Sequence, residues 1–142
     1  EAKRLSILNQ RTSEPTNLRV IFILDTVGEL IYFYNIANIV FVGGSLIKKG
    51  AQIILEPAAL GKPVITGPYM FNFRDIAGLF QENKACILAH NKEELRLNIK
   101  DILENPDRGT ELSQRAKAII LQNQGATARN LRCISNYLST EK

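Results

Sequence analysis

The stretch 39-IVFVGGSLIKKGAQIILEPAALGKPVITGP-68 decides the fold, because two apolar runs enclose one short helical segment. The runs, 39–44 and 63–67, are rich in Val and Ile and lack polar alternation, which is typical of strands covered on both faces. Between them, Pro57 is tolerated only in the first turn of a helix, where its missing N–H needs no partner. The helix is therefore expected to begin near Ile53. A strand, a helix and a strand in this order predict two parallel strands joined by a helix that crosses the sheet.

The same alternation extends in both directions from this unit. Two more apolar runs predict strands at 19–24 and 85–89. Helical periodicity predicts helices at 1–11, 28–37, 53–60, 72–83, 92–105, 107–123 and 126–139. We therefore expect an α/β fold: a Rossmann-like, doubly wound parallel sheet of about four strands with a helical C-terminal tail.

The chain is expected to form one domain and to be a fragment of a longer protein. Its 142 residues suit a single domain. A complete Rossmann-type half usually opens with a strand of its own, and that first strand is missing here. The chain also lacks an initiator methionine and begins inside a predicted helix. We therefore expect residues 1–142 to be one half of a two-domain protein.

The composition is that of a soluble globular domain. Hydrophobic residues make up 45% of the chain and charged residues 23%. No apolar run approaches the roughly 20 residues that a membrane-spanning helix needs. The net charge of +4 is scattered along the chain, so it does not indicate nucleic-acid binding. Cys86 and Cys133 are expected as buried thiols in a reducing compartment, because the sequence has no CxxC motif.

Small and polar residues that suit ligand binding follow the predicted strands. The carboxyl ends of parallel strands line the ligand crevice of such folds, and helix N-termini there offer free N–H groups to anions. Thr26 and Glu29 have the spacing of a capping box around Gly28. The second strand ends in 43-GGS-45, and the basic pair 48-KK-49 follows. Taken alone, the capping box is better explained as an ordinary cap and the lysines as solvated charges, and the glycines fit a simple turn about as well as a ligand site.

Glu56 falls in the first turn of the helix that contains Pro57. A carboxylate is stabilised there by the helix dipole, which is one explanation for it. The alternative is that Glu56 lies at the mouth of the crevice, where its two acceptor oxygens suit the paired hydroxyls of a ribose. Such a charge-assisted hydrogen bond contributes about 1.5–3 kcal/mol. Asn72 likewise either caps the next helix or reaches the ligand from its N-terminus.

Five motifs occur in an order that is informative as a set. They are 25-DTVGEL-30, 41-FVGGSL-46, 55-LEPAALGKPV-64, 67-GP-68 and 71-FNF-73. Together they resemble the C-terminal domain of 3-deoxy-D-manno-octulosonic acid (Kdo) transferases, which are GT-B glycosyltransferases of Gram-negative lipopolysaccharide assembly. The resemblance is strong over residues 19–90 and weak over the helical tail.

The resemblance implies that this domain holds the activated sugar nucleotide CMP-Kdo. By matching position, the donor-binding residues would be Gly28, Glu29, Leu30, Gly44, Ser45, Gln52, Glu56 and Asn72. The glycine motifs would meet phosphate or sugar, Glu56 would take the ribose hydroxyls, and Asn72 would lie at the edge of the cleft.

The resemblance also implies that the rest of the reaction lies outside this segment. The acceptor, a lipid A precursor at the cytoplasmic face of the inner membrane, would dock mainly on an N-terminal domain. The catalytic carboxylate would belong to that domain too, so no catalytic residue is predicted here and the segment alone is expected to be inactive. The family is inverting and needs no metal or other cofactor. No nucleic-acid partner is expected.

Two residues depart from the pattern of the family, which usually has Gly-Gly-His-Asn before Leu-Glu-Pro. Gln52 stands in place of the histidine and can form hydrogen bonds but cannot carry a charge. Ile53 replaces an amide with a hydrocarbon. Two alternatives therefore stay open. One is another GT-B domain, such as that of a UDP-sugar transferase or a nucleotide-sugar 2-epimerase, and the other is a non-catalytic interaction module.

Overall fold

Three parallel strands form the central sheet of the computed structural model, which describes residues 6–8 and 21–139. In the order β3-β4-β5, the strands are Val40–Phe41, Val64–Thr66 and Ile87–Leu88. Their register places Val40 beside Val64 and Ile65 beside Ile87. The predicted α/β fold with a parallel sheet is confirmed, and the part of the chain described here contributes three strands to that sheet.

The strand predicted at 19–24 does not join the parallel sheet. β2 (Ile21–Ile23) lies within this range, but it pairs antiparallel with β1 (Ser6–Leu8) in a separate two-stranded sheet. The helix predicted over 1–11 is therefore wrong at residues 6–8, and the rest of that segment lies outside the described residues. Apolar periodicity predicts a strand at 19–24 but does not specify the partner of that strand, which explains why β2 was assigned to the wrong sheet.

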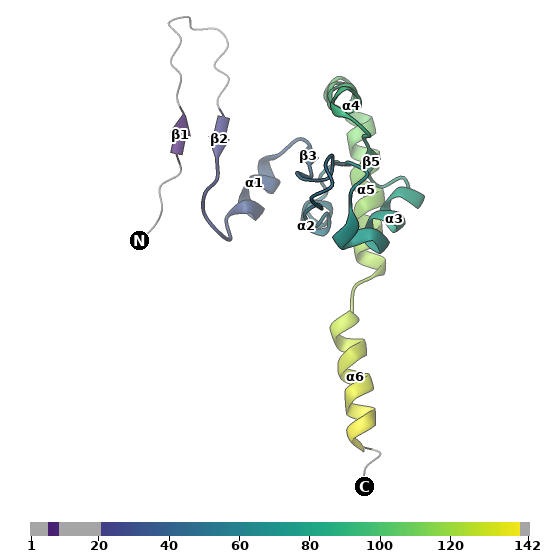
Figure 1. Cartoon of the computed structure of the whole chain (residues 1–142). Helices are drawn as coiled ribbons and strands as arrows, with labels where there is room; N and C mark the ends of the chain where they lie inside the picture. The colour runs from purple at the N-terminus through teal and green to yellow at the C-terminus, as the bar shows by residue number, and fades with distance from the viewer. Residues whose placement is uncertain (1–5, 9–20, 140–142) are drawn as a thin grey trace, which may run out of the picture.

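The middle strand is buried along its whole length, because helices cover both faces of the sheet (Figure 1). Alternate side chains of a strand point to opposite faces. Val64 accordingly joins one core, with residues of α2 (Leu55–Ala59), α3 (Arg74–Glu82) and α5 (Pro106–Gln122). Ile65 joins a second core, to which α4 (Lys92–Glu104) and α5 contribute Ile102 and Leu112. The two cores therefore lie on opposite faces of the sheet.

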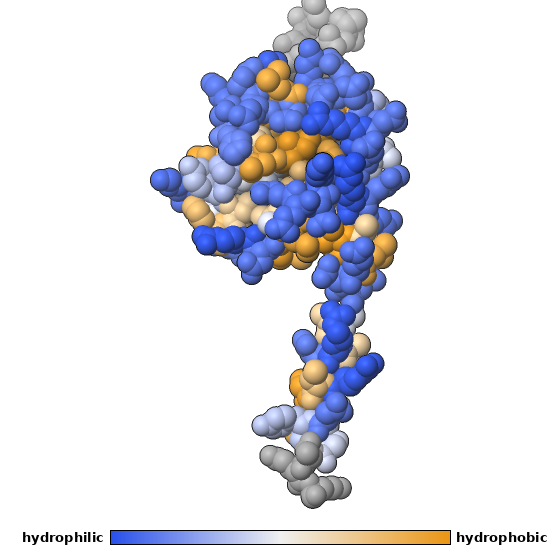
Figure 2. Space-filling view, turned by 90° about the vertical axis from the view of Figure 1, so that its right-hand side faces the viewer, coloured by the Kyte–Doolittle hydropathy of each residue, from blue (hydrophilic) through white to orange (hydrophobic). Residues whose placement is uncertain are grey.

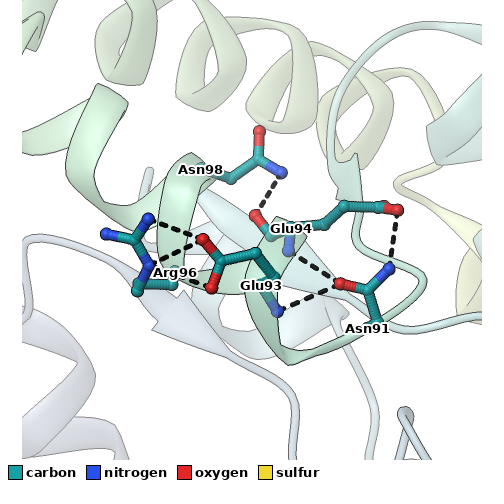
Figure 3. Close-up of polar contacts among 5 residues, drawn as sticks. All are labelled: Asn91, Glu93, Glu94, Arg96 and Asn98. Atoms are coloured by element: carbon teal, nitrogen blue, oxygen red, sulfur yellow. Dashed lines mark hydrogen bonds and ion pairs between the residues drawn. The ribbon is translucent and has the colours of Figure 1, made fainter.

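The helices that follow the sheet begin and end where the sequence predicts. The Asn91 side chain caps α4 by accepting hydrogen bonds from the N–H groups of Glu93 at 3.0 Å and Glu94 at 2.9 Å (Figure 3). One turn further on, the carboxylate of Glu93 binds the guanidinium of Arg96 at 2.6 Å, which lowers the pKa of this exposed carboxyl group. Asn105 ends α4, and Pro106 opens α5, as a residue without an N–H can.

The last helix, α6 (Ala126–Ser139), continues from the far end of α5 and points away from the sheet (Figure 1). None of its residues is buried. The apolar face predicted for it, with Leu131, Ile134 and Leu138, is therefore exposed along the helix (Figure 2). No helix in the described ranges has both the length and the apolar character to cross a membrane.

A buried hydroxyl group joins the ends of β3 and β4. Ser45 has no exposed surface, and its Oγ donates to the carbonyl oxygen of Val42 at 2.6 Å. The same Oγ accepts a hydrogen bond from the N–H of Gly67 at 2.7 Å, and the Ser45 carbonyl oxygen accepts one from the N–H of Tyr69 at 2.9 Å. We call these contacts of Ser45 with Val42, Gly67 and Tyr69 the serine staple. A Cβ on Gly67 would overlap the Ser45 carbonyl group, so the staple requires glycine at position 67.

The two cysteines differ in exposure. Cys86 is buried, and burial raises the pKa of its thiol to about 11. The expected burial is confirmed for Cys86 but wrong for Cys133, which is exposed. Cys133 lies in α6, which packs against no other described element closely enough to bury a residue.

Gly67→Ala should destabilise the protein strongly. The new methyl group overlaps backbone atoms of Ser45, and moving packed backbone costs about 1–3 kcal/mol or more. Gly78→Ala is the matched control, since a Cβ there meets nothing within 4 Å and lies inside α3. Alanine in a helix interior is favoured over glycine by about 0.8–1 kcal/mol. Urea unfolding followed by circular dichroism measures both variants, and equal stability of the two would disprove the staple.

A thiol reagent at about pH 8 should modify one cysteine of the native protein rapidly and both in denaturant. The fast thiol is Cys133, so Cys133→Ser should abolish the fast phase. Rapid modification of Cys86 in the folded Cys133→Ser variant would contradict its burial.

The raised pKa of Cys86 also makes stability depend on pH. The free energy of unfolding keeps this contribution below the ordinary thiol pKa of 9.0 and loses it as the pH rises toward about 11.

Candidate functional site

The candidate site lies at the carboxyl ends of β3 and β4, where two glycines and an asparagine come together. Gly44 has a φ of +81° and faces the carbonyl oxygen of Gly50 so closely that a Cβ would clash with it. A Cβ on Gly50 would lie 3.2 Å from the Nδ2 atom of Asn72. The loop between the two glycines therefore folds back on itself, and the Asn72 amide lies against it.

Asn72 does not cap a helix. It lies inside η1 (Phe71–Phe73), a short 3-10 helix, and α3 begins after Phe73 with no side-chain cap. The capping alternative for Asn72 is therefore wrong. The amide lies instead where Gly44 and Gly50 meet. We call the loop 43–50 together with Asn72 the glycine corner. The contact of Asn72 with a donor stays a prediction.

The glycine corner offers hydrogen-bond donors and positive charge. Among the described residues, no backbone acceptor binds the N–H groups of Gly43, Gly44 or Leu46. Lys48 and Lys49 follow in the same loop, and both are exposed and without an ion pair in the described chain. Successive N–H groups next to a residue of positive φ form a concave site that suits an anion.

Ser45 lies at this corner, but its side chain stabilises the fold. Its hydroxyl is used twice within the serine staple, and the residue has no exposed surface. Direct contact between Ser45 and a donor stays a prediction, and it requires the surrounding loop to open.

Glu56 lies in the first turn of α2, as predicted, and is exposed. It borders an apolar groove of about 530 Å³ that Ile76 and Ile119 also line. The pKa of Tyr34 is raised by burial and also by the charge of Glu56, so this carboxylate lies near α1 (Leu30–Ile36). No hydrogen bond in the described chain joins Glu56 to Asn72 or to the glycine corner. Gln52 is exposed in the loop before α2. The donor contacts of Glu56 and Gln52 both stay predictions.

The segment with Gly28, Glu29 and Leu30 is exposed and lies at the start of α1. The predicted capping box is not formed. Glu29 itself is the N-cap residue, and its carboxylate accepts a hydrogen bond from the Thr26 hydroxyl instead of binding a backbone N–H. No residue of α1 is buried. No hydrogen bond among the described residues joins this segment to the glycine corner, and its role in donor binding stays a prediction.

Two residues near the site were missed by sequence reasoning. Gly50 closes the loop against Gly44 and Asn72, and its signal was a glycine directly after two lysines. Tyr34 was missed because its proximity to Glu56 depends on the packing of α1 against α2, which no local motif specifies. No cluster of three or more His, Cys, Asp or Glu side chains that could hold a metal ion occurs among residues 6–8 and 21–139.

A solved structure is similar to this chain in fold and sequence. It is described as the "C-terminal CMP-Kdo binding domain of WaaA from Acinetobacter baumannii". The match has a TM-score of 0.65 and 32% sequence identity, and it covers 68% of this chain and 51% of the solved one.

Two curated relatives carry the name "3-deoxy-D-manno-octulosonic acid transferase". The protein from Haemophilus influenzae is 32% identical over 96% of this chain, and the protein from Bordetella pertussis is 34% identical over 80% of it. The matched region spans 32% and 27% of the length of these relatives.

The family assignment rests on a wider comparison. The family model of "Glycosyl transferases group 1" matches residues 3–119, which is most of the chain and includes all three strands of the parallel sheet. The chain belongs to the group 1 family of glycosyl transferases.

Proposed function

We propose that this chain binds the donor CMP-Kdo, as the C-terminal domain of an enzyme that transfers Kdo to a lipid A precursor in lipopolysaccharide biosynthesis. The single observation that carries the proposal is the likeness, at 32% identity and a TM-score of 0.65, to a domain described as binding CMP-Kdo. The two Kdo transferases that match 96% and 80% of the chain support it.

The glycine corner supplies a chemical reason for binding such a donor. The free N–H groups of Gly43 and Gly44, together with Lys48 and Lys49, suit the phosphodiester that links cytidine to the sugar. As the sugar centre becomes cationic during transfer, negative charge grows on the departing phosphate. Donors that are fixed in place before the reaction stabilise this charge without reorganising. Asn72, whose amide lies against Gly50 at this corner, would bind the sugar beside the phosphate.

On this proposal, the rest of the reaction belongs to a part of the enzyme beyond residues 1–142. The Haemophilus influenzae relative is about three times as long as the region it shares with this chain. An N-terminal domain would bind the acceptor at the cytoplasmic face of the inner membrane and provide the catalytic carboxylate. This chain by itself would then bind the donor without transferring the sugar.

Calorimetric or NMR titration with CMP tests donor binding and the predicted role of Glu56. The wild-type chain should bind CMP more tightly than UDP or GDP. Glu56→Gln removes the charge and keeps the shape, and it should weaken CMP binding roughly 10- to 150-fold if a charge-assisted bond of about 1.5–3 kcal/mol to the ribose is lost. Glu104→Gln is the control, because Glu104 is an exposed carboxylate at the end of α4.

Each other result has a distinct meaning. If Glu56→Gln binds CMP as the wild type does, Glu56 does not hold the ribose. A clear preference for UDP would replace the proposal with a UDP-sugar transferase. Absence of binding to all three nucleotides would favour a non-catalytic interaction module, in which the departures at Gln52 and Ile53 record a lost donor site.

A further inference from the structure

Arg74 occupies a position that fold stability does not explain. It is the first residue of α3, where the positive end of the helix dipole disfavours a cation. The next residue, Asp75, is of the charge that such a position favours. Arg74 is exposed and forms no hydrogen bond or ion pair with any residue that the structure describes. Residues that break a local rule without a compensating contact are concentrated at functional sites.

Arg74 lines a small hollow. The hollow has a volume of about 280 Å³, and Pro68, Phe71, Gly78 and Gln81 also line it. Arg74 is the one charged residue among those that line it. Pockets for complete small-molecule ligands usually have volumes of roughly 300–1,000 Å³, so this hollow suits one part of a larger ligand.

The hollow is built by the same segment that forms the glycine corner. Residues 68–74 leave β4 through the serine staple, place Asn72 against Gly50 and end at Arg74. The ring of Phe71 is held by Tyr69, with ring centroids 5.6 Å apart and planes inclined at 49°. The hollow and the corner are therefore linked by a short stretch of backbone.

We propose that the hollow binds the transferred sugar of the donor, not its ribose, and that Arg74 binds the carboxylate of that sugar. The inference rests on the proposed function, because it assumes a sugar-acid nucleotide as the donor. Such a donor carries two anions, the phosphodiester and the carboxylate, and both are attached to the same sugar carbon. The free N–H groups and the lysines of the corner suit the first anion, and Arg74 remains for the second. A guanidinium group can bind both oxygens of a carboxylate at once, which a lysine cannot. Phe71 and the apolar wall would cover a face of the sugar ring.

Comparison of two ligands tests the assignment. CMP lacks the Kdo sugar and its carboxylate, whereas freshly prepared CMP-Kdo has both. Arg74→Ala should weaken CMP-Kdo binding at least about tenfold and CMP binding less than about twofold, measured by calorimetry. Arg74→Lys keeps the charge but loses the two-point contact, so it should fall between the wild type and Arg74→Ala. Arg96→Ala is the control, because Arg96 is an exposed arginine paired with Glu93 on α4. It should leave both affinities unchanged.

The outcomes separate this inference from the proposed function. If the wild type binds CMP-Kdo and Arg74→Ala binds it equally well, the inference fails and the proposed function stands. If Arg74→Ala weakens both ligands by the same factor, Arg74 acts on the nucleotide or on the fold, and the inference also fails. If the wild type binds neither ligand, the proposed function fails and the inference falls with it. Circular dichroism of each variant distinguishes a lost contact from a lost fold.

Discussion

The serine staple is the constraint on which the rest of the site depends. Its two side-chain hydrogen bonds, at 2.6 and 2.7 Å, are buried and join the ends of two neighbouring strands. A buried N–H group that loses its acceptor destabilises the fold by about 1–3 kcal/mol. These hydrogen bonds therefore hold the loop after β4 in this position. The third bond, from the N–H of Tyr69 to Ser45, sets the direction in which the chain leaves the strand. The positions of Asn72 and Arg74 follow from that direction, since both belong to the segment that begins there.

The sequence predicted the central part of the fold because the signals there are local and agree with one another. Buried strands without alternation, a proline in a first turn and an Asn-Pro boundary each define one element, and β3, β4, β5 and the helices after them lie where these signals place them. One error concerns an element, since residues 6–8 form a strand where a helix was predicted, and the other errors concern partners. β2 is a strand but pairs antiparallel with β1, and Cys133 is in a helix but exposed. Which surface covers an apolar face depends on packing that periodicity does not contain.

The candidate site was predictable to a similar extent. Parallel strands bring their carboxyl ends to one edge, which placed Gly44 and Asn72 at the same predicted crevice, and both lie against Gly50. The direction of the Ser45 side chain was not predictable, because a Gly-Gly-Ser turn permits it to face either a ligand or the interior. The spacing of Thr26 and Glu29 was misleading for a related reason. Their side chains bind each other, and neither caps α1.

The charges of the site are arranged so that attraction to an anionic donor is not cancelled. Glu56 would repel a phosphate if its carboxylate lay at the glycine corner, since two like charges at 4 Å in a medium with an effective dielectric constant of 20 repel by about 4 kcal/mol. The carboxylate instead raises the pKa of Tyr34 and borders the groove beside Ile76 and Ile119, while Lys48 and Lys49 follow the corner itself. These cations and Arg74 are exposed, so water and salt weaken their attraction to a bound donor. A second wall that closes over the crevice would exclude this water and strengthen every one of these contacts together. On the proposed function, these groups would bind a donor weakly on an open surface and more firmly once an acceptor domain covers them.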